Sequence, residues 1–248
     1  MNLQAQVIIV TGAASGIGKA AALALAAKGA TVLSADFNAE GAQATAADIV
    51  AKGGKAAAFK VDVSDPVQVE ALVDFTVETF GTLNGIFNNA GISLTKPFLE
   101  MDPASYLKVI AVDQHSVYSG MYYAAKKMVA IGAKGTFVNT ASIFGTMASK
   151  GSFNYNAAKA AVVMMSKSGA LELAEHGIRV VGVAPGFIDT PMFGDNDALK
   201  AEVARQHIHN KLISPEQVAD VVAFLFTDAA SAINGQTVPV DDGYLVFK

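Results

Sequence analysis

Residues 7–18 read Val7-Ile8-Ile9-Val10-Thr11-Gly12-Ala13-Ala14-Ser15-Gly16-Ile17-Gly18, a β-branched run that leads straight into a glycine-rich turn. Gly12 allows a tight turn, Gly16 lets the backbone approach a pyrophosphate, and Gly18 lets the next helix pack closely on the strand. Glycines also turn chains that bind no ligand, and the spacing differs from the general Gly-x-Gly-x-x-Gly fingerprint. The position at the first strand-to-helix junction nevertheless favours nucleotide binding, because free N–H groups at a helix start attract phosphates. We expect contacts from Gly12, Ser15, Gly16, Ile17 and Gly18.

Strand-like and helix-like segments alternate along the rest of the chain. We expect strands over residues 6–10, 31–35, 56–61, 85–88, 136–140, 178–184 and 236–240. We expect helices over 16–28, 39–52, 103–131 and 152–176, with further helices starting at Asp65-Pro66 and at Ser214-Pro215. Such alternation predicts a parallel sheet covered on both faces.

A (β/α)8 barrel and an open sheet both suit a chain of 248 residues. Seven expected strands, rather than eight, and the glycine-rich first crossover favour the open sheet, in which ligands bind beyond the carboxyl ends of the strands. We therefore expect an α/β fold: a doubly wound, mainly parallel, seven-stranded Rossmann-like sheet with helices on both faces, forming a single dinucleotide-binding and catalytic domain over residues 1–248.

Composition limits the possible function classes. A chain that is 52% hydrophobic and 16% charged is not disordered. Its net charge of -4 and scattered basic residues do not indicate nucleic acid or an anionic membrane surface as a partner. It has no long uncharged apolar run and no basic secretory leader, so a cytoplasmic location is expected. The chain has no cysteine, and His207 and His209 lack a surrounding ligand cluster, so we expect them at the surface and expect no metal.

Asp36 ends the second expected strand, about twenty residues after the turn, where a carboxylate can bind the adenosine ribose hydroxyls. A carboxylate there would repel a 2′-phosphate, and Phe37 rather than a basic residue follows it. We therefore expect NAD rather than NADP as cofactor, with Asp36 and Phe37 in contact with it. Alternatively, Asp36 only caps the next helix.

Tyr155 and Lys159 are four residues apart and share a helix face. An unperturbed tyrosine ionises too weakly to act as a base near neutrality, but a nearby ammonium and an oxidised nicotinamide would lower its pKa. Ser142, just beyond the fifth expected strand, could orient a substrate oxygen. Tyr155 would then accept a proton during alcohol oxidation and donate it during ketone reduction. Alternatively, the two residues are an ordinary amphipathic pair, with the lysine extended to solvent.

These residues and other motifs resemble the short-chain dehydrogenase/reductase family, of its single-domain, NAD-preferring type. Residues 11–18 match its T-G-x-x-x-G-x-G turn, and Asn88-Asn89-Ala90-Gly91 matches its N-N-A-G segment. Tyr155-Asn156-Ala157-Ala158-Lys159 matches Y-x-x-x-K, thirteen residues after Ser142, and Pro185-Gly186 with Thr190 matches the turn after the sixth strand. The resemblance covers nearly the whole chain.

The resemblance implies an oxidoreductase that transfers a hydride between NAD(H) and a secondary alcohol or ketone. It implies Ser142, Tyr155 and Lys159 as the catalytic residues, with Lys159 also binding the nicotinamide ribose and Asp113 at a fourth catalytic position. A regulator that binds NAD(H) without turnover is the alternative; a methyltransferase and a sugar-nucleotide epimerase fit the motifs less well. Further cofactor contacts are expected by motif position, although Asp62 could instead only cap a helix. These contacts are Asp62, Val63, Asn89, Ala90, Gly91, Pro185, Gly186, Ile188 and Thr190.

One residue departs from the family pattern. Where the family carries asparagine in a segment like V-N-x-x-G, this chain reads Val112-Asp113-Gln114-His115-Ser116-Val117. The resemblance implies that this position helps hold a water that links the catalytic lysine to solvent. A backbone carbonyl could still hold that water, or the Asp113 carboxylate could pair with Lys159 directly and partly cancel its effect on Tyr155. We expect His115 to have a structural role.

The expected substrate surroundings are mostly apolar, which favours an apolar or cyclic secondary alcohol, and the choice of NAD leans toward oxidation. Residues 193–207 interrupt the strand–helix alternation and form the expected lid. The apolar runs over residues 157–165 and Tyr244-Leu245-Val246-Phe247 exceed what an isolated surface needs, unless they are buried within one subunit. The family resemblance implies a homotetramer or a dimer. The expected pocket residues are Ile92, Ser93, Ile143, Phe144, Met147, Phe153, Phe187, Met192 and Phe193.

Overall fold

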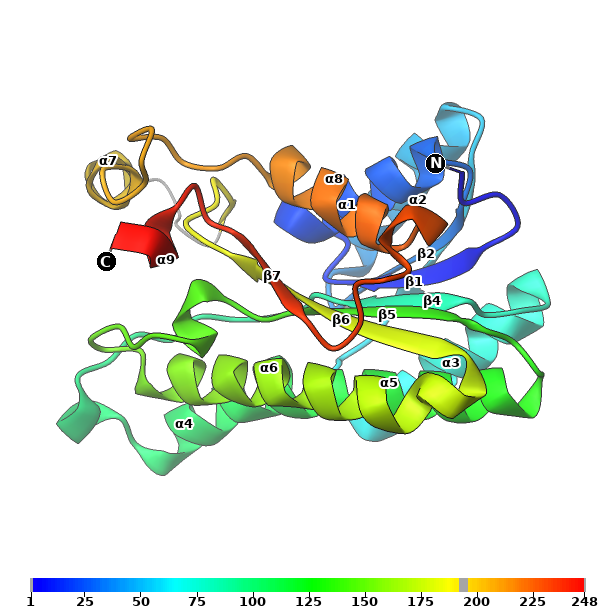
Figure 1. The fold of residues 1–248 in the computed structure, drawn as a ribbon, viewed down its shortest axis with the longest axis horizontal. Coiled ribbons are helices and arrows are strands. Elements are labelled where there is room, and N and C mark those ends of the chain that lie inside the picture. The colour runs from blue at the N-terminus through cyan, green and yellow to red at the C-terminus, as the bar shows by residue number, and fades with distance from the viewer. Residues whose placement is uncertain (1, 192–195, 248) are drawn as a thin grey trace.

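The computed structural model describes residues 2–191 and 196–247, and within them the strands form one parallel sheet in the order β3-β2-β1-β4-β5-β6-β7 (Figure 1). β1 and β4 are buried at every position, as expected of central strands covered on both faces. The predicted doubly wound, seven-stranded Rossmann-like fold is confirmed. The strands are β1 (Val7–Thr11), β2 (Thr31–Asp36), β3 (Lys55–Lys60), β4 (Gly85–Asn88), β5 (Gly135–Thr140), β6 (Ile178–Pro185) and β7 (Thr237–Val240).

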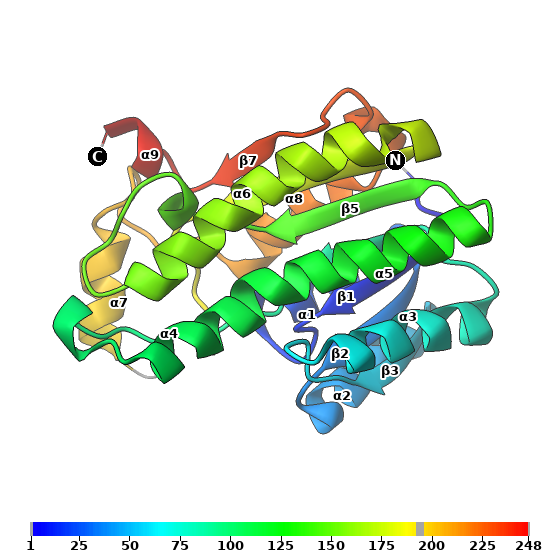
Figure 2. The same cartoon turned by 90° about the horizontal axis from the view of Figure 1, so that it is seen from below.

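Helices cover both faces of this sheet (Figures 1 and 2). One face is covered by α1 (Gly16–Ala27), α2 (Ala39–Ala51) and α8 (Pro215–Leu225). The other face is covered by α3 (Pro66–Phe80), α4 (Pro103–Ile110), α5 (Ser116–Ala130) and α6 (Phe153–Leu173). The remaining helices and turns are α7 (Asp197–Ala204), α9 (Tyr244–Phe247), η1 (Phe98–Glu100), η2 (Ala111–His115), η3 (Ile143–Gly145), η4 (Ala174–His176) and η6 (Asp228–Ala230).

Each face has its own apolar core. Leu25 of α1 and Val222 of α8 are fully buried in one cluster, and Leu72 of α3 and Met128 of α5 are fully buried in the other. Burying a side chain of this size contributes about 1.5–3 kcal/mol. The helix starts follow the predicted caps: the Asp65 carboxylate accepts a hydrogen bond from the backbone N–H of Val67, with proline at the first helical position.

The expected helix over residues 103–131 contains an irregularity that the sequence did not predict. Between α4 and α5 the backbone forms a π-helical turn, η2, over Ala111–His115. A π-turn spans one residue more than an α-turn, and such turns are frequent at functional sites. Asp113 lies at the middle of this turn.

The strand order reverses between β1 and β4. β1 pairs with β2 on one side and with β4 on the other, and the two following crossovers run in opposite directions. In such sheets the loops at the carboxyl ends separate at the reversal and leave a crevice, where ligands bind. The glycine-rich turn after β1 and the Asn89-Ala90-Gly91 segment after β4 border this crevice.

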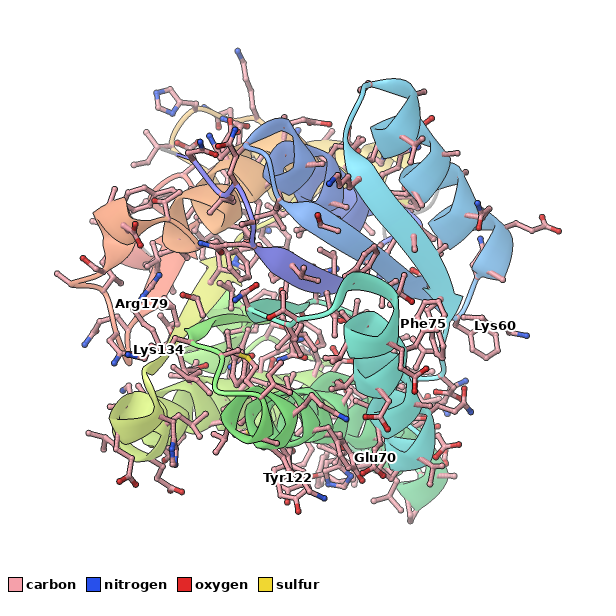
Figure 3. The ribbon with its side chains drawn as sticks, turned by 90° about the vertical axis from the view of Figure 1, so that its right-hand side faces the viewer. Lys60, Glu70, Phe75, Tyr122, Lys134 and Arg179 are labelled. Carbon is pink, nitrogen blue, oxygen red and sulfur yellow. The ribbon has the colours of Figure 1, made fainter. Side chains whose placement is uncertain are left out.

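The opposite edge of the sheet, which faces the viewer in Figure 3, has a different character. An open cavity of ≈ 320 Å³ is lined there by Lys134 and Arg179, among others. The Arg179 guanidinium donates to the carbonyls of Ile233 (3.0 Å) and Leu225, and to the Thr136 hydroxyl (3.1 Å). Arg179 therefore ties the end of α8 to the sheet, far from the crevice, and we assign it a structural role.

Replacing Arg179 by Met should lower the melting temperature by several degrees. Loss of a hydrogen bond to a charged group costs about 1.5–3 kcal/mol, and 1 kcal/mol corresponds to about 2–4 °C in a chain of this size. Lys134→Met, in the same cavity, is the matched control and should shift the temperature by less than about 1 °C. Equal melting temperatures for both variants, measured by circular dichroism, would contradict this structural role.

Candidate active site

Lys159 of α6 is buried near the carboxyl edge of the sheet, with 2% of its surface exposed. Its ammonium donates to the carbonyl of Thr140 at the end of β5 (2.9 Å) and lies 3.2 Å from Asp113 Oδ2. Asp113 is fully buried, and its Oδ1 accepts a hydrogen bond from the Ile92 N–H (2.8 Å). The alternative in which Lys159 extends to solvent is wrong, and the direct pairing with Asp113 is present.

Tyr155 lies one turn earlier on α6, with Lys159 Nζ 5.5 Å from the centre of its ring. Ser142 lies near enough to the phenol to act on its pKa. Ser142 Oγ accepts a hydrogen bond from the Phe144 N–H (3.1 Å). Ser142 follows β5 directly and is 5% exposed. The fold thus brings Ser142, Tyr155 and Lys159 together, from the end of a strand and from one face of a helix.

Burial and the neighbouring groups act on the pKa of Tyr155 in opposite directions. Burial raises the pKa of the Tyr155 phenol; Lys159 and Ser142 act to lower that pKa, and Asp113 acts to raise it. Lys159 thus acts in the predicted direction, but the pKa of Tyr155 is raised, because burial disfavours the phenolate more than Lys159 favours it. The pKa of Lys159 is raised even though burial opposes this, because Asp113 and Tyr155 both favour the ammonium. Burial raises the pKa of Asp113, against the Coulomb attraction of Lys159.

The glycine-rich turn has the shape of a phosphate cradle. Gly12 and Gly16 adopt positive φ angles of 68° and 52°, which a residue with a Cβ adopts only with strain. A Cβ added to Gly18 would lie 2.0 Å from the carbonyl oxygen of Gly12, so only glycine fits there. Ser15 precedes α1 without a side-chain capping bond, and no acidic residue stands in the first turn. The helix start thus offers free N–H groups that fit a pyrophosphate.

Asp36, at the end of β2, is bonded to this turn. Its carboxylate accepts from the backbone N–H of Ala14 (2.9 Å) and from that of Asn38 (2.9 Å). Asn38 is the residue that caps α2, so the alternative in which Asp36 caps this helix is wrong. Likewise Asp62 accepts from the N–H and hydroxyl of Ser64 and is not the cap of α3.

Lys60, which the sequence analysis did not single out, lies beside Asp36. It is the register partner of Asp36 on β3, and its ammonium lies 5.9 Å from the ring centre of Phe37, whose surface is 69% exposed. The strand periodicity could have revealed Lys60 only if the register of β2 against β3 had been known.

Thr11 joins the ends of two strands. Its hydroxyl donates to the carbonyl of Phe87 (3.3 Å) and accepts from the N–H groups of Asn89 (2.9 Å) and Ala90 (3.1 Å). Asn89 in turn donates to the Thr11 carbonyl (3.1 Å) and accepts from the Thr140 hydroxyl (3.3 Å). These bonds position the Asn89-Ala90-Gly91 segment, and neither threonine's side chain was identified from sequence.

The segment after β6 turns back toward the glycine-rich turn. Gly186 donates to the carbonyl of Val240 (3.0 Å), and Ile188 forms a bridge with Ile213. A Cβ added to Gly16 would lie 3.2 Å from Thr190 Cγ2, so the two expected cofactor segments meet. Val63, which precedes α3, is buried in the same apolar cluster as Leu72.

Aromatic rings gather where β5, β6 and β7 end. The centre of the Phe187 ring lies 5.9 Å from that of Phe144 and 5.5 Å from that of Tyr244. Tyr244 is 7% exposed, so the first residue of the C-terminal apolar run is buried within the subunit. The sequence did not distinguish Tyr244 from its neighbours, because the whole apolar run also suggested a contact between subunits.

His207 joins this aromatic group and is 2% exposed, so the prediction that it lies at the surface is wrong. Its ring bonds to the Lys211 carbonyl (2.6 Å) and accepts from the Phe187 N–H (3.2 Å), a role that no local pattern shows. His209 is exposed as predicted and contacts Asp242 (2.7 Å). His115 is exposed on η2.

The other expected pocket residues have mixed surroundings. Ile143 is buried in the core, whereas Phe153 is half exposed and packs against Phe98. Ile92 packs with Tyr155 in a small apolar cluster. Ser93 is exposed, and Met147 is partly buried. Met192 and Phe193 lie outside the described residues, as does the beginning of the expected lid.

Over residues 2–191 and 196–247, histidine, aspartate and glutamate side chains form no group of three that could hold a metal ion. No helix in those same ranges has the length and apolar character needed to cross a membrane.

The sequence and the fold of this chain are similar to those of known proteins. A family model described as enoyl-(acyl carrier protein) reductase matches residues 12–245. Cyclohexanol dehydrogenase of Acinetobacter sp. (strain SE19) is 42% identical over 240 residues, which are 96% of this chain and 94% of that protein. Cis-4-hydroxycyclohexanecarboxylate dehydrogenase of Sinomonas cyclohexanicum is 41% identical, with 96% of each chain covered. The crystal structure of a short-chain type dehydrogenase/reductase from Mycobacterium marinum superposes with a TM-score of 0.95 at 32% identity, covering 99% of this chain and 97% of the other.

Replacing Gly12 by Ala should destabilise the protein more than Gly53→Ala does. Both glycines have positive φ, 68° and 82° respectively, so both variants carry the left-handed strain of about 1–2 kcal/mol. A Cβ on Gly12 would also lie 2.9 Å from Asn89 Nδ2 and 3.0 Å from Ala90 Cα, whereas a Cβ on Gly53 meets nothing within 4 Å. Urea denaturation measures the difference; equal losses would show that the turn has room for a side chain.

Proposed function

The chain belongs to the short-chain dehydrogenase/reductase family and acts on CH–OH groups, and we propose that it transfers a hydride between NAD(H) and an apolar cyclic secondary alcohol or its ketone. The observation that carries the proposal is the meeting of Ser142, Tyr155 and Lys159 beside the crevice at the carboxyl edge of the sheet. These side chains come from separate elements, and a protein that only bound a nucleotide would have no need of them.

Each residue has a defined task in this proposal. Ser142 donates a hydrogen bond to the substrate oxygen and holds it next to the phenol. Tyr155 accepts the proton from the alcohol hydroxyl during oxidation and returns it to the ketone oxygen during reduction. Lys159 stabilises the phenolate through its charge and binds the nicotinamide ribose. A bound nicotinamide supplies the hydride acceptor or donor.

The cofactor would lie across the crevice, from α1 to the turn after β6. The cradle made by Gly12, Gly16 and Gly18 fits the pyrophosphate, and Ser15 and Ile17 flank it. Asp36 and Phe37 would contact the adenosine ribose, and the Asp36 carboxylate would exclude a 2′-phosphate. The remaining proposed contacts are Asp62, Val63, Asn89, Ala90, Gly91, Pro185, Gly186, Ile188 and Thr190.

The substrate class follows from the aromatic rings near Ser142. Phe144 follows Ser142 by two residues, and Phe187 and Tyr244 stand in contact with it and with each other. Such rings bury an apolar surface and offer no charge to a charged substrate. The relatives named for cyclohexanol and for hydroxycyclohexanecarboxylate support a six-membered alicyclic alcohol.

We also propose a cytoplasmic homotetramer in which residues 1–248 act as one dinucleotide-binding and catalytic domain. Tyr118 and Tyr122 stack on the outer face of α5 and are 58% and 47% exposed. On α6, Met164 and Leu171 are 58% and 82% exposed. These exposed, mostly apolar side chains on two long helices support contacts between subunits.

Replacing Tyr155 by Phe should reduce the rate of alcohol oxidation by about two or more orders of magnitude, because the general base is removed. Formation of NADH, followed by absorbance with a panel of cyclic secondary alcohols, measures the rate. NADH binding, followed by fluorescence, should stay within about threefold. Retained turnover would contradict the role of Tyr155, whereas binding without turnover in the unmodified protein would favour the regulator.

Replacing Asp36 by Asn should raise the ratio of kcat/KM with NADP to that with NAD by about tenfold or more. The change removes the charge that repels a 2′-phosphate and preserves the shape of the side chain. Lys60, its neighbour on β3, would then attract the phosphate, so the Asp36→Asn, Lys60→Met double variant should lose most of the gain. An unchanged ratio in the single variant would show that Asp36 does not select the cofactor.

A further inference from the structure

The Asp113 carboxylate is placed by an irregular backbone at the centre of the site. It stands in the π-turn η2, on which α4 ends and α5 begins. Oδ1 is held by the Ile92 N–H at 2.8 Å, so Oδ2 is left to face Lys159 at 3.2 Å. A side chain fixed at one oxygen and paired at the other has little freedom to leave the ammonium.

The space around this ion pair is closed. Asp113 is 0% and Lys159 2% exposed. A Cβ added to Gly91 would lie 2.8 Å from Asp113 Oδ2 and 3.6 Å from Lys159 Nζ, so the backbone of the expected cofactor-binding segment covers the pair. Water screens a buried charge only weakly, and each of the two charges is therefore felt strongly by its neighbours.

The groups that face the Tyr155 phenol can be named element by element. Lys159 comes from its own helix, Asp113 from η2 and Ser142 from the end of β5, while Tyr106 of α4 packs in the same apolar cluster. Their charges are one positive, one negative and two neutral. The site is thus electrically neutral before a cofactor binds, whereas an amide at position 113 would leave it with one positive charge.

We propose, on the basis of the function proposed above, that the Asp113 carboxylate is the counterion that sets the pH at which alcohol oxidation begins and that favours the oxidised over the reduced nicotinamide. Asp113 is a positioning residue in this proposal: it acts through the charge of Lys159 and touches neither substrate nor hydride.

The first consequence concerns the pH dependence. Oxidation needs the phenolate form of Tyr155, and a carboxylate nearby disfavours that form. An amide at position 113 would lower the pKa of Tyr155, so the acidic limb of the oxidation profile would move to lower pH. This shift would raise the rate at low pH relative to the rate at high pH, whereas a general loss of activity would lower the rate at every pH.

The second consequence concerns the cofactor. The oxidised nicotinamide ring carries a positive charge and the reduced ring is neutral, so a nearby carboxylate stabilises the oxidised form more. Removing this carboxylate weakens NAD⁺ binding relative to NADH binding. A dehydrogenase that works toward oxidation gains from this preference, because NADH leaves more readily once it has formed.

The test compares Asp113→Asn with the unmodified protein. The amide oxygen can still accept from the Ile92 N–H, so the change removes charge and preserves shape. We expect the acidic limb of kcat for oxidation of a cyclic secondary alcohol to move down by about one pH unit or more. We expect the ratio of the Kd for NAD⁺ to the Kd for NADH, measured by calorimetry, to rise at least about threefold. Asp113→Ser should shift both in the same direction if Asp113→Asn does not fold.

Asp48→Asn is the matched control. Asp48 is 50% exposed and pairs with Lys19 (3.0 Å) between α2 and α1, so its loss changes the net charge equally without touching the site. It should leave the pH limb and the Kd ratio unchanged. An unshifted limb and an unchanged ratio in Asp113→Asn, with or without a uniform fall in kcat, would overturn the proposal. If the unmodified protein oxidised no alcohol, the proposed function would fail, and the Kd ratio would still decide the role of Asp113.

Discussion

The buried ammonium group of Lys159 constrains much of this structure. Lys159 is 2% exposed, and a buried charge without a partner would cost several kcal/mol. Three separate parts of the chain offset this cost. β5 supplies the Thr140 carbonyl, and η2 supplies the Asp113 carboxylate. The segment after β4 supplies the Ile92 N–H, which fixes Asp113. Moving any one of these parts would leave a buried polar group unsatisfied.

The reversal of strand order between β1 and β4 determines where these parts can meet. The loops after the two strands diverge there, and Thr11 holds them in place through its bonds to Asn89 and Ala90. On the far side of the crevice, β5 ends next to Ser142. The position of the glycine-rich turn and the meeting of Ser142, Tyr155 and Lys159 are thus consequences of one topology.

The electrostatic balance at the site is where this chain departs from a simple tyrosine–lysine pair. Lys159 favours the phenolate of Tyr155, but burial raises the pKa of the phenol and Asp113 adds to this rise. In the proposed reaction, positive charge from an oxidised nicotinamide would favour the phenolate, so the proposed proton acceptor would be coupled to the group that accepts the hydride.

The sequence by itself determined the sheet of seven strands, the glycine cradle and the pairing of Tyr155 with Lys159, because strand alternation, turn glycines and helical spacing are local properties. It also showed that Asp113 was exceptional. Only the tertiary structure decided the direction in which the pKa of Tyr155 shifts, the burial of His207 and the contact between Asp113 and Lys159. Each of these depends on groups far apart in the chain and on the exclusion of water, which no local pattern records.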